Sequence, residues 1–270
     1  MTQVHLAQRV KPVARPRRRY GSQIRKVAIL IISVLAGLVI WQVLSWQFGP
    51  ALVASPAETA EAAFALLIDG TLWEAITASS YRILLGWLLG VAVGAPLGLL
   101  MGRIAVIREL AEPYIEFFRF IPPIAFVTLA VVWFGLGDMS QIVLIFYTSV
   151  FVVVINTMAG AVATDETKLR AAASLGASRF QTLYSIVLPS AVPHIVTGAR
   201  LALGNSFLTI VSAEMVAADQ GLGVLIWTSR NYGRIDWTFV GIITLGVIGF
   251  FFDRALRLLV SPLAKYKAKI

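Results

Sequence analysis

Six long apolar segments constrain what this chain of 270 residues can fold into. A membrane-spanning helix needs about 20 consecutive, mostly apolar residues. Runs of this kind lie at 27–46, 81–101, 117–134, 141–163, 195–217 and 239–260. Only 14% of the residues are charged, whereas soluble domains contain about 25%. The sequence therefore predicts an all-α integral membrane protein with six transmembrane helices.

Lysine and arginine are unevenly distributed among the segments that connect these runs. Counting the edges of the runs, all but three of the 23 basic residues lie before the first run, between the second and third, between the fourth and fifth, or at the C-terminal end from residue 254 onward; the exceptions are Arg82, Arg230 and Arg234. Basic residues accumulate on the cytoplasmic side of membrane proteins. We therefore expect both termini in the cytoplasm, which requires an even number of spans.

The first 26 residues form a strongly basic region, which we interpret as a cytoplasmic tail preceding a transmembrane domain at 27–270. A cleaved signal peptide is the alternative, because it too joins a basic region to an apolar one. Its apolar part is only about 7–15 residues long. The run at 27–46 is longer and carries Trp41 and Trp46 near its far end, where tryptophan anchors a span at the membrane interface.

Glycine recurs at every fourth position along the second run. The five positions are Gly86, Gly90, Gly94, Gly98 and Gly102. A four-residue spacing keeps them near one helical face, where small residues let a second helix approach closely. The pattern predicts helix packing and indicates nothing about function.

Two adjacent prolines, Pro122 and Pro123, interrupt the third run. Each lacks a backbone donor, so a continuous helix should kink or break there. A broken helix within a membrane is tolerated where it lines a cavity or is covered by protein. A short helix that simply begins at Pro122 is an equally good interpretation, because proline suits a first helical turn.

Polar residues within the spans are candidates to line a pathway. Asn205, Thr209 and Ser212 share one face of the fifth run, and Glu214 and Arg119 add charges. Hydrogen bonding between helices satisfies the same polar groups, so both interpretations remain open at this point. A glutamate at membrane depth requires a partner or water.

The sequence contains no signature of catalysis. It lacks cysteine and a G-x-x-x-x-G-K-[ST] phosphate-binding loop, and its two histidines do not have the spacing of metal ligands. We therefore expect no catalytic residue, no metal and no cofactor in this chain. We also expect no nucleic-acid partner, because the placement of the basic residues is explained by membrane orientation.

The segment 165–189, which includes RAAASLGASRFQTLYSIVLP, lies between the fourth and fifth runs. Asp165 can cap a helix that ends near Gly176, and Ser178 can cap a second helix, Arg179 to Leu188, ended by Pro189. Small residues allow close docking, and Leu175 and Phe180 offer apolar anchors. The pair could fill a groove on a separate soluble protein or lie on the chain's own spans.

The pattern A-A-x-x-L-G-A, followed by I-x-L-P, resembles the coupling motif of permease subunits of bacterial ABC importers. It covers Ala171 to Ala177 and Ile186 to Pro189. Arg170 occupies a position where that family commonly has glutamate. The stretches RFIPPIA at 119–125, WFGLG at 133–137, GAR at 198–200, AE at 213–214 and GLG at 221–223 look like the nitrate, sulfonate and taurine branch. The resemblance extends over about residues 72–259.

The resemblance implies a type I importer permease in the bacterial inner membrane, with a coupling helix between spans four and five. The implied partners are a second copy of this chain, two ATPase subunits that bind Mg-ATP, and an extracytoplasmic binding protein that delivers a small anion. Residues of the coupling segment that would contact the ATPase are Leu169, Arg170, Ala171, Ala172, Ala173, Ser174, Leu175, Gly176, Ala177, Ser178, Arg179 and Phe180. Relatives carry a vitamin or pyrimidine precursor or an aromatic acid, so the resemblance leaves the identity of the substrate open. A secondary transporter, a channel subunit or a membrane scaffold is the alternative outside this class.

Overall fold

The computed structural model describes residues 20–265, all of whose regular secondary structure is helical. Residues 1–19 of the predicted basic tail lie outside the described residues. The helices run α1 Tyr20–Phe48, α2 Pro56–Ile68, α3 Thr71–Arg103, α4 Ala105–Phe118, 3₁₀ turn η1 Pro123–Phe126, α5 Val127–Phe134, α6 Asp138–Val162, α7 Glu166–Ser174, α8 Arg179–Thr182, π-helix η2 Leu183–Val187, α9 Leu188–Ala217, α10 Leu222–Asn231 and α11 Ile235–Lys265.

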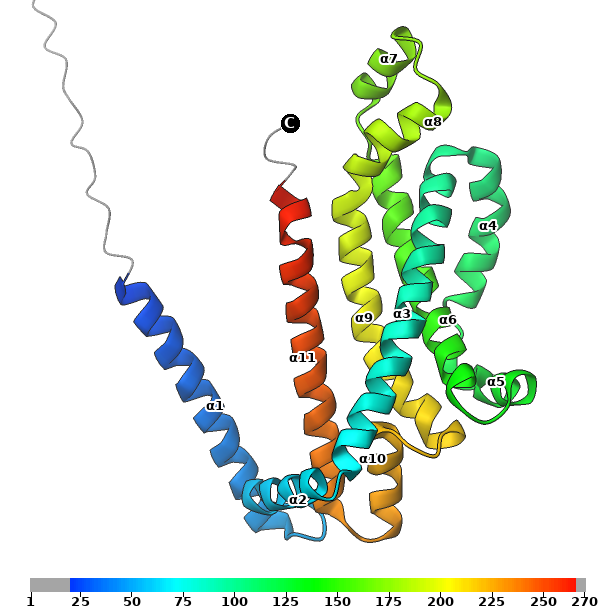
Figure 1. Ribbon diagram of the computed structural model, residues 1–270. Helices are drawn as coiled ribbons and strands as arrows, with labels where there is room; N and C mark the ends of the chain where they lie inside the picture. The colour runs from blue at the N-terminus through cyan, green and yellow to red at the C-terminus, as the bar shows by residue number, and fades with distance from the viewer. Residues whose placement is uncertain (1–19, 266–270) are drawn as a thin grey trace, which may run out of the picture.

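Long helices run side by side between two ends of the bundle (Figure 1). The short helices α7 and α8 lie at one end, which we call the α7 end, and α2 and α10 lie at the other, the α10 end. Within residues 20–265, five helices are long and apolar enough to cross a membrane, and a bent helix pair raises the total to six. The fold class expected from the sequence is confirmed.

The packed centre consists of α3, α6 and α9. The glycine face of α3 lies against α6, as the four-residue spacing predicted. A Cβ atom added at Gly90 would lie 2.4 Å from the Cβ of Ser149, and one at Gly98 would lie 2.6 Å from the carbonyl oxygen of Val154. These distances are too short for any side chain, so the glycines set how closely the two helices approach.

The third predicted span, 117–134, is wrong as a single helix. The chain instead forms α4, which ends at Phe118, and the pair η1 and α5, bent from α4 by 90°. The eight residues of α5 extend about 12 Å, whereas the hydrocarbon layer is about 30 Å thick. Pro122 and Pro123 therefore break the span that the apolar residues of 117–134 suggested. The residues that complete the length of a span lie upstream, in α4.

The other predicted spans correspond to single helices that are mostly longer than expected. The largest extension is in α3, which begins at Thr71 instead of residue 81. Helix α2, capped by Ser55 and followed closely by α3, forms the surface helix at the α10 end. Helix α1 stands apart from the bundle and meets it near α2 (Figure 1), where Trp41 stacks on Phe239 and donates a hydrogen bond to the carbonyl of Ala54.

Candidate functional site

A cavity of about 430 Å³ opens beside the break between α4 and η1. One wall is the broken segment from Arg119 to Pro123, and the others come from α6 and α9. Three of the five pathway candidates line it: Arg119, Asn205 and Thr209. Most of the surface is apolar, so these polar groups stand out as the contacts available to a small polar solute.

Tyr147 of α6 holds the broken segment in place. Its hydroxyl donates to the carbonyl of Phe118 and lies 3.3 Å from that of Ile121. Both carbonyls belong to the turn at the proline break, where Pro122 and Pro123 have no N–H to donate, and such groups must be satisfied inside a membrane. The carbonyl of Phe118 also accepts from the N–H of Ile121. The sequence analysis missed Tyr147, because nothing local connects a tyrosine to a turn 26 to 29 residues away.

Thr209 makes the interhelical contact that the sequence left open and also lies at the cavity. Its hydroxyl lies 3.0 Å from that of Thr148 on α6, while the residue also lines the cavity. Ser212 hydrogen-bonds to the backbone carbonyl of Thr209 and is not among the cavity-lining residues. Whether these residues line a transport pathway stays a prediction.

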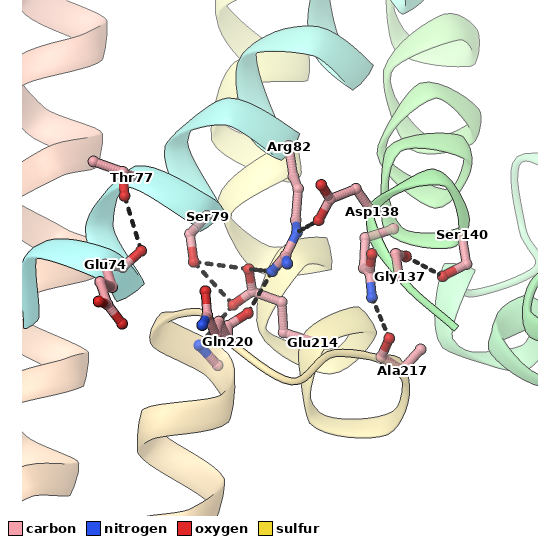
Figure 2. A network of polar contacts seen from close by, with 12 residues as sticks. Glu74, Thr77, Ser79, Arg82, Gly137, Asp138, Ser140, Glu214, Ala217 and Gln220 are labelled. Atoms are coloured by element: carbon pink, nitrogen blue, oxygen red, sulfur yellow. Dashed lines mark hydrogen bonds and ion pairs between the residues drawn. The ribbon is translucent and has the colours of Figure 1, made fainter. Parts of the chain in front are cut away.

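Glu214 lies away from the cavity, in a network of polar contacts near the α10 end (Figure 2). Only 1% of the residue is exposed. Its carboxylate accepts hydrogen bonds from Arg82 at 2.7 Å, from the Ser79 hydroxyl, and from the backbone N–H of Gly223 at 2.8 Å. The partner that a buried glutamate requires is therefore Arg82, which the sequence analysis had noted only as an exception to the basic-residue pattern.

The coupling segment begins with a helix whose two ends are stabilised as predicted. The Asp165 side chain accepts from the N–H of Thr167, which caps α7 and lowers the pKa of this carboxyl. At the other end, the N–H groups of Gly176 and Ala177 donate to the carbonyls of Ala173 and Ala172. This is a Schellman motif, and Gly176 takes the positive φ of +76° that it requires.

Most of the coupling residues are exposed. Ala172 is buried, Leu169 and Ala177 are half-buried, and the remainder face solvent. Leu175 is 87% and Phe180 is 74% exposed, although both are large and apolar. Arg170, at the position where the resembled family has glutamate, pairs with Glu166 one turn earlier at 2.8 Å.

The prediction that Pro189 ends the second helix is wrong. Ser178 caps α8 with a capping box, as expected, but the chain continues through η2 into α9. A proline ring normally clashes with the carbonyl four residues earlier, here that of Ser185. Ser185 lies in the wider π turn, whose bonds span five residues, and Pro189 occupies the first turn of α9.

Comparisons with known proteins give the same picture. A family model described as "Binding-protein-dependent transport system inner membrane component" matches residues 94–265. A probable ABC transporter permease protein of Brucella melitensis is 35% identical over 88% of this chain and 96% of its own length. The taurine transport system permease protein of Escherichia coli is 37% identical over 75% of this chain and 74% of its own. A nitrate import permease protein of Synechocystis is 31% identical over 92% and 94%.

Among solved structures, the MetNI methionine ABC transporter in an inward-facing form matches with a TM-score of 0.59 at 20% identity, covering 70% of this chain and 95% of that one. This likeness shows the fold. The family model covers most of the chain, and the alignment with the Brucella melitensis relative covers most of both proteins. The chain therefore belongs to the family of binding-protein-dependent transport system inner membrane components, the permeases of ABC transporters.

Proposed function

We propose that this permease forms the translocation pathway for a small organic or inorganic anion, in the class of taurine, other sulfonates or nitrate. The observation that carries the proposal is the cavity at the broken helix, where Arg119 supplies a cation and Asn205 and Thr209 supply polar contacts. A guanidinium matches the planar or tripodal oxygens of such anions. The named substrates of the taurine and nitrate relatives fall in the same class.

Uptake of radiolabelled taurine, an alkanesulfonate and nitrate by cells that express the whole transporter tests this substrate class. We expect Arg119→Gln to lower uptake of the preferred anion at least about tenfold, and Arg119→Lys to lower it less, because lysine keeps the charge but loses the planar fork. Uptake of a neutral or cationic vitamin precursor that is insensitive to Arg119→Gln would contradict the proposal.

The partners belong to the proposal as well. Two copies of this chain would form the core, two ATPase subunits would bind Mg-ATP and dock on residues 165–189, and a binding protein would deliver substrate at the α10 end. The α7 end would then face the cytoplasm, in accord with the distribution of basic residues. ATP-driven closure of the ATPase pair would move the docked helices and shift the permease between two states.

Copurification of the ATPase with tagged permease tests the docking. Leu175→Ser should lower the ATPase yield several-fold, because an exposed apolar anchor at an interface is lost while the fold of the chain does not depend on it. Leu136→Ser is the matched control, since Leu136 is also mostly exposed and lies between α5 and α6, away from α7. Equal ATPase yields for both variants would contradict the docking surface and favour the scaffold or secondary-transporter alternatives.

A further inference from the structure

The network around Arg82 has one arm that is fully buried (Figure 2). Arg82 Nη1 contacts Glu214 at 2.7 Å and the backbone carbonyl of Gln220 at 2.6 Å, and the Glu214 side chain has no exposed surface. The Ser79 hydroxyl donates to Glu214 and accepts from the N–H of Leu222 at 2.9 Å. This arm joins α3, α9 and the start of α10.

Close packing holds the contacts of the buried arm in place. A Cβ atom at Gly221 would lie 2.4 Å from the Glu214 carboxylate, so the loop before α10 rests directly on that group. Two backbone N–H groups at the start of α10 point at Ser79 and Glu214. Breaking the contact with Arg82 would leave a buried carboxylate without its cation, which is strongly unfavourable.

The second arm is different, because it reaches solvent. Arg82 Nε contacts Asp138 at 2.7 Å, and 54% of the Asp138 side chain is exposed. Asp138 is the first residue of α6 and follows Gly135 and Gly137, both with positive φ. Only the Asp138 side of this pair is exposed, since the Arg82 side chain is 6% exposed. The carboxylate of Asp138 can exchange Arg82 for water, while Arg82 keeps its contacts with Glu214 and the carbonyl of Gln220.

The arm to Asp138 connects α3 to the corner between α5 and α6. This corner follows the broken third span in the chain. The α5–α6 corner, residues 134–141, is also attached to α9 through Ala217, whose carbonyl accepts from the side-chain amide of Gln141 at 2.6 Å and from the N–H of Gly137 at 3.4 Å. Before and after the corner, α5 and α6 pack on α9 in a buried apolar cluster. Helix α5 continues from the segment that forms the cavity wall. Movement of the corner would therefore move that wall.

We infer that Arg82 is a positioning residue of the transport cycle: it is fixed to Glu214 and releasably clamps the α5–α6 corner through Asp138, which keeps the cavity closed toward the α10 end. The inference rests on the proposed function and adds which contact must open for substrate to enter. Release of Asp138 frees the corner from α3, so that α5 and the start of α6 can shift together with α9, to which Ala217 attaches them.

Thiol labelling tests the clamp directly, because the chain contains no cysteine and an introduced one is the only thiol in the permease. Asn205→Cys places a reporter in the cavity. Intact cells that express the whole transporter are treated with a membrane-impermeant maleimide, which reaches the cavity from outside only. We expect Asp138→Asn to raise the labelling rate about fivefold.

Three matched variants separate clamping from general damage. Glu61→Gln removes a carboxylate from α2, at the same end of the bundle, and should leave the labelling rate unchanged. Asp138→Glu should return the rate to that of the parent, because it restores the carboxylate. The midpoint of thermal unfolding should change little in Asp138→Asn, since Arg82 keeps Glu214 and the carbonyl of Gln220.

The outcomes are distinguishable. Labelling by a permeant maleimide without an effect of Asp138→Asn on outside labelling would overturn the clamp and leave the pathway intact. An increase as large for Glu61→Gln as for Asp138→Asn would also overturn it. A reporter that no maleimide reaches, in any nucleotide state, would overturn the cavity as a pathway and the clamp with it.

Discussion

Two groups of residues at opposite ends of the bundle differ in how charged and apolar side chains are placed. At the α10 end, Arg82 and Glu214 are charged and buried, and each contacts several groups of the chain itself. At the α7 end, Leu175 and Phe180 are apolar and exposed, and the ion pair between Arg170 and Glu166 lies in solvent. The buried charges at the α10 end are thus satisfied by contacts within the chain, whereas the exposed apolar residues of α7 and α8 form a surface suited to another molecule.

This contrast has a physical basis in how each end is built. A buried ion pair is stable only when nearly every donor and acceptor around it is satisfied, so the α10 end tolerates little change. The helices α7 and α8 depend on local caps and small residues, which allow a self-contained unit to project from the bundle. Variants of the buried charges and of the exposed apolar residues should therefore differ in what they damage: folding in the first case, and binding of the ATPase in the second.

The largest effect is expected from Arg82→Met. The free energy of unfolding should fall by about 3–5 kcal/mol, because Glu214 remains buried without its cation. The double variant Arg82→Met with Glu214→Gln should recover most of that loss, since a neutral amide still accepts from Ser79 and Gly223. Thermal unfolding in detergent measures both, and equal stability of Arg82→Met and the parent would show that the pair does not hold the α10 end together.

A smaller effect on stability is expected between the two ends, where α3 packs on α6. Gly90→Ala should cost about 1–3 kcal/mol, because the added methyl group would lie 2.4 Å from Ser149. Gly37→Ala in α1 is the matched control: nothing lies within 4 Å of its added methyl group, and alanine favours a helix by about 0.5–1 kcal/mol. The same unfolding assay applies, and a loss of equal size at both positions would contradict the packing.

At the α7 end, Gly176→Ala should cost about 1–2 kcal/mol of local helix stability, because alanine is strained at a φ of +76°. No atom lies within 4 Å of the added methyl group, so steric crowding does not contribute to this cost. We expect less ATPase to copurify and no change in the unfolding of the bundle. Gly176→Asn is the control, since asparagine tolerates this conformation better. If Gly176→Ala also lowered the stability of the bundle, the helices at the α7 end would not be a separate unit.

The sequence predicted the features that depend on neighbours along the chain. The glycine spacing of α3, the caps at Asp165 and Ser178, and the left-handed turn at Gly176 each follow from a few consecutive residues. The features it missed depend on residues far apart. Arg82 and Glu214 are separated by 132 positions, and no local pattern pairs them. The available signal was an arginine within an apolar run on the side that has only three basic residues, together with a single glutamate in another apolar helix.

Proline was the other source of error, for a related reason. Pro122 and Pro123 gave the correct expectation of a break, but the length of α4 upstream was hidden by its charged residues, which kept it below the apolar threshold. Pro189 suggested a helix end, although the π turn before it removes the clash that ends helices. In both places the effect of a proline depends on the backbone conformation and length of the neighbouring helical turns. The proline alone does not determine these.

The smallest predicted effect concerns the cap of α7 and its dependence on pH. The N–H of Thr167 lowers the pKa of Asp165 below its usual value, so the ionised carboxylate stabilises the folded helix. This contribution is complete above the pKa of the unfolded chain and is lost as the pH falls through the lower, folded value, that is, below about pH 4. Hydrogen exchange should therefore show falling protection of the α7 amides in that range. Asp165→Asn keeps an acceptor of similar capping strength without a titrating group, so its protection should stay flat as the pH is lowered. A parallel decline in the variant would assign the loss to other groups and would leave the cap of α7 independent of the charge on Asp165.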